Sequence, residues 1–196
     1  MHRKSGVMLL ITILAMAACV QNAAPERPQP DVSDRPFASG GRINLQLEAG
    51  SYEVQPFPTG DRIRVALTGD RGSASVVTID PTHAEVTIKN GRDSHFQGTV
   101  EVPPVSNLQI RASAGNLTIG PITGDKGIAS RAGTIKIAVT NPDEYSSVDA
   151  SVNAGDIKAR PFGASYSGLL PRLTWTGKGT YRMHVELWAG NVAFQN

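Results

Sequence analysis

One cysteine, few aromatic residues (6%) and few charged residues (18%) occur in this chain of 196 residues. The single cysteine excludes an intramolecular disulfide and a zinc site built from several cysteines. The chain has 19 Lys and Arg against 17 Asp and Glu, and two of the basic residues, Arg3 and Lys4, lie in a segment that we expect to be removed. The remaining chain is neutral and lacks the basic surplus that binds phosphates, so no nucleic-acid partner is expected.

Motifs for catalysis and cofactor binding are also absent from the sequence. It contains no serine-hydrolase elbow, no P-loop and no HExxH stretch. Gly177 and Gly179 lack the third glycine of a dinucleotide motif. We therefore expect no cofactor, no resident metal and no catalytic residue, and hence no enzyme.

The N-terminus has the features of a secretion signal, which we assign to residues 1–18. A short basic segment precedes an apolar run from Val7 to Ala15, which is too short to span a bilayer. Met16-Ala-Ala-Cys19 resembles the lipobox of bacterial lipoproteins. The resemblance implies cleavage before Cys19 and attachment of lipid to this residue. The alternative is an ordinary signal cut near Ala18, which leaves Cys19 as a free thiol.

The residues after Cys19 predict a tether over residues 19–40. Val20 stands where an Asp would signal retention in the inner membrane, so the lipoprotein resemblance implies an outer-membrane location, facing the periplasm or the cell surface. Proline fixes φ and removes a backbone donor, so the proline-rich stretch should be extended and partly stiff. The prolines of this stretch are Pro25, Pro28, Pro30 and Pro36.

Strands dominate residues 41–196, which we assign to one β-domain. Apolar and polar residues alternate with period two, which is typical of strands, and no pattern with helical spacing persists over three turns. Asn90-Gly91 follows one such segment and predicts a hairpin. The alternating segments are 43–48, 62–68, 84–89, 100–102, 108–112, 117–119, 135–139, 148–152 and 181–188.

A weak repeat of Ala-Gly pairs overlies the strands, and an alternating segment follows each pair. Glycine permits a tight corner that a Cβ atom would obstruct. Gly115, Gly133 and Gly155 are 18 and then 22 residues apart, about one coil of a β-solenoid. The sequence thus predicts an all-β fold, a β-solenoid or β-roll with glycine corners, with an antiparallel β-sandwich as the alternative. The corner glycines are Gly50, Gly115, Gly133, Gly155 and Gly190.

The same repeat resembles a known bacterial domain. The segments 113–125 (SAGNLTIGPITGD), 131–137 (RAGTIKI) and 153–158 (NAGDIK) are similar to the β-repeat domain usually labelled "putative adhesin". The resemblance covers residues 41–196 and is strongest over 107–160. It implies a β-solenoid or β-roll with a non-catalytic role in the cell envelope.

Two clusters of polar residues could still carry chemistry. Asp80, His83, Asp93 and His95 flank the predicted hairpin and could bind a metal if the turn joined them, although turn chemistry explains both aspartates. His184 and Glu186 share the polar face of one strand, as a general base and its partner would, but a solvated charge ladder is favoured.

Two groups of residues, one basic and one aromatic, are candidates for ligand-binding surfaces. Arg42, Arg62 and Arg64 could form a stripe that contacts anionic lipid or polysaccharide, although pairing with nearby carboxylates is favoured. An exposed aromatic platform could stack on sugars, but a plug that closes the end of the solenoid is favoured. The aromatic residues concerned are Tyr166, Trp175, Tyr181, Trp188 and Phe194.

These features predict a non-catalytic, lipid-anchored envelope protein with an interaction or scaffold domain. Its expected partners are the membrane, through lipid on Cys19, and an envelope polysaccharide or protein. The alternative is a β-helix protein that binds or cleaves polysaccharide.

Overall fold

The computed structural model describes residues 32–196, apart from residues 59, 69–71 and 91–95. The predicted signal, Cys19 and the tether up to residue 31 lie outside the described residues. The described part contains thirteen strands and two short 3-10 helices but no α-helix, so the predicted all-β class is confirmed. The strands are β1 (Val32–Pro36), β2 (Arg42–Leu47), β3 (Gly50–Pro56), β4 (Arg62–Thr68), β5 (Ser73–Asp80), β6 (His83–Lys89), β7 (Gln97–Val102), β8 (Asn107–Ile119), β9 (Lys126–Ala138), β10 (Tyr145–Ala159), β11 (Ala164–Leu169), β12 (Arg172–Thr176) and β13 (Tyr181–Gln195), and the helices are η1 (Pro142–Glu144) and η2 (Arg160–Phe162).

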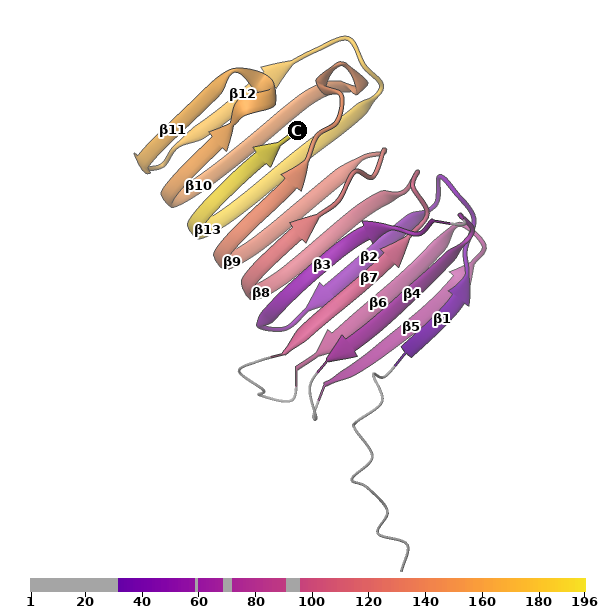
Figure 1. Ribbon diagram of the computed structural model, residues 1–196. Helices are drawn as coiled ribbons and strands as arrows, with labels where there is room; N and C mark the ends of the chain where they lie inside the picture. The colour runs from indigo at the N-terminus through magenta and orange to yellow at the C-terminus, as the bar shows by residue number, and fades with distance from the viewer. Residues whose placement is uncertain (1–31, 59, 69–71, 91–95) are drawn as a thin grey trace, which may run out of the picture.

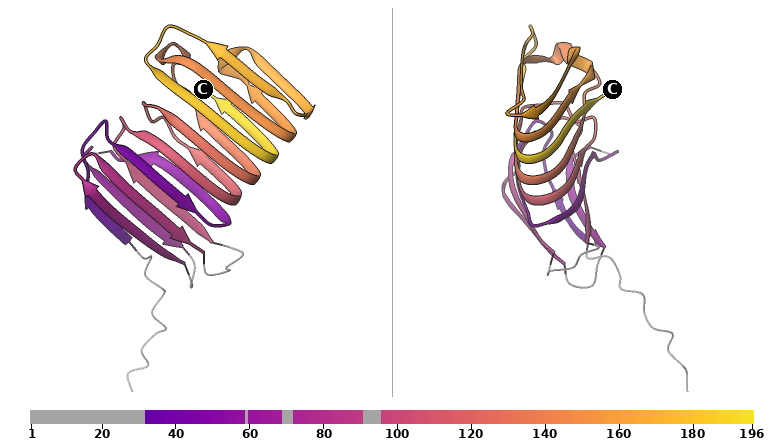
Figure 2. Two further views of the ribbon diagram at one scale, coloured as in Figure 1. Left: turned by 180° about the vertical axis from the view of Figure 1, so that it is seen from behind. Right: turned by 90° about the vertical axis from the view of Figure 1, so that its left-hand side faces the viewer.

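All strands belong to one sheet that is folded over into two arms (Figures 1 and 2). The long strands β8, β9, β13 and β10 pass from one arm to the other, so their two halves pair with different neighbours. The first arm contains β5, β6, β2, the first halves of the long strands, and β12. The second arm contains β1, β4, β7, β3, the second halves of the long strands, and β11.

Strand direction changes along the sheet. The central strands, from β2 and β3 through β8, β9, β13 and β10, are parallel. The outer pairs β1–β4, β4–β7, β5–β6, β10–β11 and β10–β12 are antiparallel. Neither a fully parallel coil nor an antiparallel sandwich describes the sheet along its whole length.

The core lies between the two arms. In β13, Met183, Val185 and Leu187 are buried while Arg182 and His184 are exposed, so the alternation in the sequence becomes an inner and an outer face. The buried residues form one continuous cluster across both arms. Because each fully buried large aliphatic side chain contributes about 1.5–3 kcal/mol, this face holds the two arms together.

Glycines allow the long strands to bend between the arms. Gly50, Gly115, Gly133, Gly190 and Gly155 are neighbours in that order across five strands. All except Gly50 have positive φ, from 112° to 141°. A Cβ atom on Gly133 would lie 1.8 Å from the carbonyl oxygen of Gly115, and similar contacts recur along the row. Only glycine therefore fits these bends. We call the edge formed by these bends and their flanking residues the bend edge.

The order of the bends departs from the order of the chain. We expected Gly155 to lie directly on Gly133, one coil after the other. Instead β13 lies between β9 and β10, and Gly190 separates the two. After β9 the chain passes through η1 and skips one strand position, which the end of the chain then fills.

Two further expectations change at the N-terminal part of the sheet. Residues 32–40 are not tether, because β1 pairs with β4 and Phe37 is buried in the core. Pro36 fits because it ends an edge strand, where no ladder hydrogen bond is lost. The hairpin expected at Asn90-Gly91 is wrong, since β6 pairs with β2 and β5 whereas β7 pairs with β3 and β4. This connection links the two arms.

Candidate functional site

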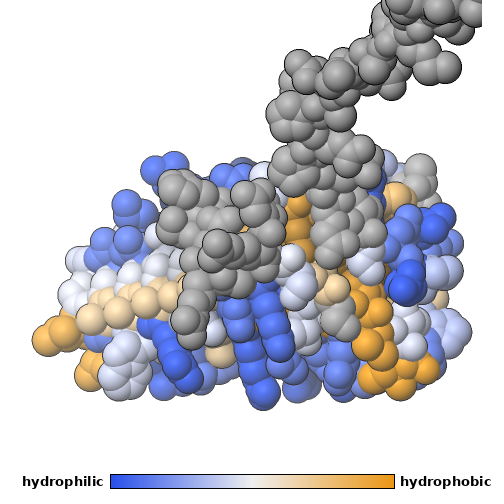
Figure 3. All heavy atoms as spheres, turned by 90° about the horizontal axis from the view of Figure 1, so that it is seen from below, coloured by the Kyte–Doolittle hydropathy of each residue, from blue (hydrophilic) through white to orange (hydrophobic). Residues whose placement is uncertain are grey.

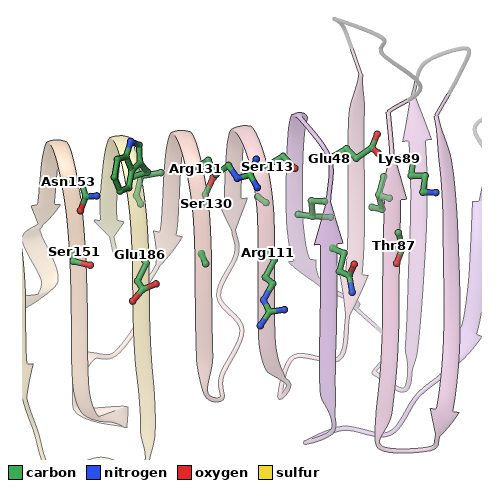
Figure 4. A pocket seen from close by; sticks show the side chains of 17 residues that line it. Glu48, Thr87, Lys89, Arg111, Ser113, Ser130, Arg131, Ser151, Asn153 and Glu186 are labelled. Atoms are coloured by element: carbon green, nitrogen blue, oxygen red, sulfur yellow. The ribbon is translucent and has the colours of Figure 1, made fainter.

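An open groove of about 760 Å³ crosses the outer face of the first arm beside the bend edge. Residues of β6, β2, β8, β9, β13 and β10 line it, and their side chains project from neighbouring strands (Figure 4). We call it the corner groove. Its charged lining residues are Glu48, Lys89, Arg111, Arg131 and Glu186.

Small residues on β9 make the floor of the corner groove. Ala129 lies between Arg111 of β8 and Glu186 of β13 in the strand register. Because β9 presents only a methyl group at Ala129, the longer side chains of Arg111 and Glu186 on either side enclose a trough.

Both signs of charge and several neutral polar groups share the corner groove. Arg111 and Glu186 belong to one outward row that continues to Ser151 on β10. Arg131 and Asn153 lie nearer the bends (Figure 4). This lining can donate and accept hydrogen bonds along an extended ligand, and it does not create a single-sign field that would select a strongly charged ligand.

His184 and Glu186 do form a pair. Nε2 of His184 lies 3.0 Å from Oε1 of Glu186 on the outer face of β13. The side chains are 59% and 61% exposed. A general base acts in a setting shielded from water, and this exposed pair has no such setting. The geometry matches the charge ladder that the sequence favoured.

The structure describes two residues of the candidate metal cluster, Asp80 and His83. The Asp80 carboxylate accepts hydrogen bonds from the backbone and hydroxyl of Thr82, both at 2.7 Å, as in an Asx turn. Nε2 of His83 lies 3.3 Å from Nδ2 of Asn44. Asp93 and His95 lie outside the described residues. Within the described part, no group of three or more His, Cys, Asp or Glu residues is placed to hold a metal.

The three arginines do not form a stripe. Arg42 lies on β2 in the first arm, whereas Arg62 and Arg64 lie on β4 in the second. Arg62 Nε donates to Asp34 at 2.7 Å, and Arg64 lies 3.7 Å from Glu101. Arg62 and Arg64 are therefore paired surface charges, and their partners Asp34 and Glu101 lie far from them in the sequence.

The aromatic residues near the C-terminus fall into two groups, one packed together and one exposed. Phe162 of η2 contacts Trp175 and Phe194, with ring centroids 5.0 and 5.5 Å away, so two of the five aromatic residues of the predicted plug pack together through Phe162, whereas Tyr166 is exposed. Trp188 does not join them. It lines the corner groove and is 68% exposed.

A buried lysine was missed by sequence analysis. Lys126 is 2% exposed, and its Nζ donates to the Tyr145 hydroxyl at 2.8 Å and to the Gly124 carbonyl at 3.1 Å. Burial lowers the pKa of Lys126 to about 8, against the opposing effect of Glu144 and Asp125. Burial also raises the pKa of Tyr145. The only signal in the sequence is that Lys126 occupies an inward position two residues before Ile128.

Comparisons with known proteins show the fold. No family model and no curated protein matches the chain. Its fold is similar to the crystal structure of a "putative cell adhesion protein" from Clostridium sporogenes, with a TM-score of 0.51 and 10% identity over 85% of this chain and 99% of that one. A "putative adhesin" from Bacteroides fragilis also matches, at 10% identity over 86% of this chain and 98% of that one, with a TM-score of 0.27. At this identity, the first likeness concerns the fold alone.

No helix in the described part is long and apolar enough to cross a membrane.

Proposed function

We propose that this chain is a lipid-anchored, adhesin-like protein of the bacterial cell envelope that binds an extended envelope polymer without chemical turnover. The corner groove carries this proposal. It is open, crosses six strands and is lined by both hydrogen-bond donors and hydrogen-bond acceptors. A shallow groove of this form suits a chain that lies across the strands, and it lacks the enclosed setting that turnover requires.

A neutral polysaccharide is the ligand that this lining fits best. Sugar hydroxyls both donate and accept hydrogen bonds, and Arg111, Glu186 and Ser151 supply the complementary groups along one row. The anchor is proposed from Met16-Ala-Ala-Cys19, and the bent, solenoid-like stack of strands would hold the groove at the membrane surface. The fold likeness to a "putative cell adhesion protein" supports an envelope role.

Co-sedimentation of the full chain with insoluble peptidoglycan, and affinity electrophoresis in envelope polysaccharide, test the proposal. Arg111→Ala should weaken binding about tenfold, because a charge-assisted hydrogen bond is lost. Arg64→Ala, on the outer face of the second arm, is the matched control and should bind normally. Released sugar that disappears with His184→Ala or Glu186→Gln would instead establish a polysaccharide-cleaving enzyme. Equal binding by both arginine variants would remove the groove as the binding site.

A further inference from the structure

Three large apolar side chains are exposed together at one end of the bend edge. Leu169, Leu170 and Trp188 are 84%, 73% and 68% exposed. Leu169 pairs with Ala154, which pairs with Ala189, the residue that follows Trp188. The backbone of Leu170 donates to the Asn153 carbonyl at 3.0 Å. The three side chains therefore come from β13, from the end of β11 and from the link between β11 and β12, at the same edge of the sheet, with β10 between β13 and β11.

Small apolar residues continue this edge along the sheet. The alanines that precede the bend glycines are neighbours across β8, β9, β13 and β10. The molecule seen from below shows a line of apolar residues that ends in a strongly apolar patch (Figure 3). Arg131 is exposed beside this line, and its long stem can keep its charge in water over an apolar surface. The alanines are Ala114, Ala132, Ala189 and Ala154.

The chain enters the fold on the same side. Val32 pairs with Ala66 near the end of β4, and Thr68 at that end pairs with Gln97 at the start of β7. β7 lies parallel to β3, which starts at the bend glycine Gly50. Val32 is therefore on the bend side of the second arm. The first described residue of the chain therefore lies toward the side that carries the apolar edge.

We propose that the bend edge lies on the lipid bilayer, with Trp188, Leu169 and Leu170 inserted at the boundary between headgroups and acyl chains. This inference rests on the proposed lipid anchor at Cys19. About a dozen residues separate Cys19 from Val32 and reach at most about 45 Å. The second arm has nine strands from β1 to β11, which span about 38 Å. The tether is long enough for the whole edge to lie flat.

A bilayer explains this edge better than a sugar does. Trp188 alone could stack on a sugar ring, but Leu169 and Leu170 offer sugars no hydrogen bond. Tryptophan is favoured at the membrane interface because its ring is apolar and its N–H is polar. A lipid anchor holds a protein at the membrane more firmly when the protein makes a second contact with the bilayer. The row of Arg111 and Glu186 lies four residues from the bend glycines Gly115 and Gly190, or about 13 Å, so the corner groove would open toward the headgroups.

Fluorescence of the anchored protein tests this arrangement. The chain has two tryptophans, so Trp175→Phe leaves Trp188 as the only one. The lipidated Trp175→Phe protein is placed in vesicles of phosphatidylcholine and phosphatidylglycerol, with or without brominated acyl chains. We expect a blue-shifted emission and at least twofold quenching by bromine. Trp188→Phe leaves Trp175, which packs against Phe162, and should not be quenched.

Flotation separates the two proposals. A protein that does not float with the vesicles overturns the anchor and, with it, the position of the bend edge. A protein that floats while Trp188 is unquenched overturns the bend-edge inference alone. If soluble polysaccharide changes the emission of Trp188 and brominated lipid does not quench it, Trp188 belongs to the ligand site of the corner groove and not to the membrane contact. Leu170→Cys, labelled with an environment-sensitive dye in the lipidated protein, repeats the test without altering either tryptophan and should report an apolar setting.

Discussion

At the residue scale, the central bends depend on the missing Cβ atom of glycine. Gly133→Ala places a methyl group 1.8 Å from the Gly115 carbonyl oxygen at a φ of 124°, so both the contact and the backbone are strained. We expect unfolding free energy to fall by more than about 4 kcal/mol, or folding to fail. Gly168→Ala has a similar φ of 110° but no atom within 4 Å, and should lose only about 1–2 kcal/mol. Urea unfolding of the two variants measures both values, and equal losses would contradict the close packing of the bends.

Lys126 should make stability depend on pH in an unusual direction. Its pKa is about 8 in the folded state and near 10.5 in the unfolded chain. Below pH 8 both states are protonated, and burial of the charge opposes folding. As pH rises above 8 the folded state releases its proton first, so stability increases. Between pH 8 and 9.5 the gain should be about 2 kcal/mol, before the raised pKa of Tyr145 begins to act in the opposite sense above pH 10.

Denaturant unfolding at pH 8 and 9.5 measures this gain. Lys126→Met should remove it, because the residue no longer titrates. Lys136→Met, at an exposed position of the same strand, should retain it. A gain that survives in Lys126→Met would assign the pH dependence to another group. The sequence could not predict this site, since a lysine at an inward position is recognisable only when its two acceptors are brought to it by the fold.

At the scale of elements, the strands could be predicted and their order could not. Alternation with period two follows directly from strand geometry, so the buried faces of β2, β6 and β13 were evident in the sequence. The glycine repeat also indicated which positions lie beside one another. Insertion of β13 between β9 and β10 leaves no local signature, because any of these strands presents the same apolar face and the same bend.

The position of β13 predicts an asymmetric response to truncation. Removal of residues 181–196 uncovers an edge on both β9 and β10 and takes Met183, Val185 and Leu187 out of the core. We expect this protein to lose its cooperative unfolding transition. Deletion of residues 32–36 removes only the edge strand β1 and should leave a cooperative, less stable domain. Circular dichroism during urea unfolding distinguishes the two. A cooperative transition without β13 would contradict the central position of that strand.

At the scale of the whole molecule, the site was only partly visible in the sequence. His184 and Glu186 were recognisable as neighbours on one strand, and the structure pairs them. The corner groove was not predictable, because Arg111, Ala129 and Glu186 come from three strands whose adjacency depends on the strand order. The sequence favoured Trp188 as part of the plug over an exposed position, whereas the structure exposes Trp188 and packs Phe162 against Trp175 and Phe194.

The groove, the apolar bend edge and the start of β1 together give the molecule an orientation. The edge with Leu169, Leu170 and Trp188 and the N-terminal residue Val32 are on one side, so an anchor preceding Val32 would hold this side toward the membrane. Both proposals about location depend on that anchor. The polymer proposal concerns the corner groove itself and is tested separately.

Labelling with radioactive palmitate in bacterial cells, followed by membrane fractionation, tests the anchor most directly. The full chain and its Cys19→Ser variant are compared, because Cys19 is the only cysteine. We predict that the unaltered chain incorporates palmitate, is shortened by cleavage before Cys19 and sediments with membranes, whereas the variant remains unlabelled and uncleaved. Equal labelling of the two proteins, or an unaltered chain that is cleaved without label, would contradict the account.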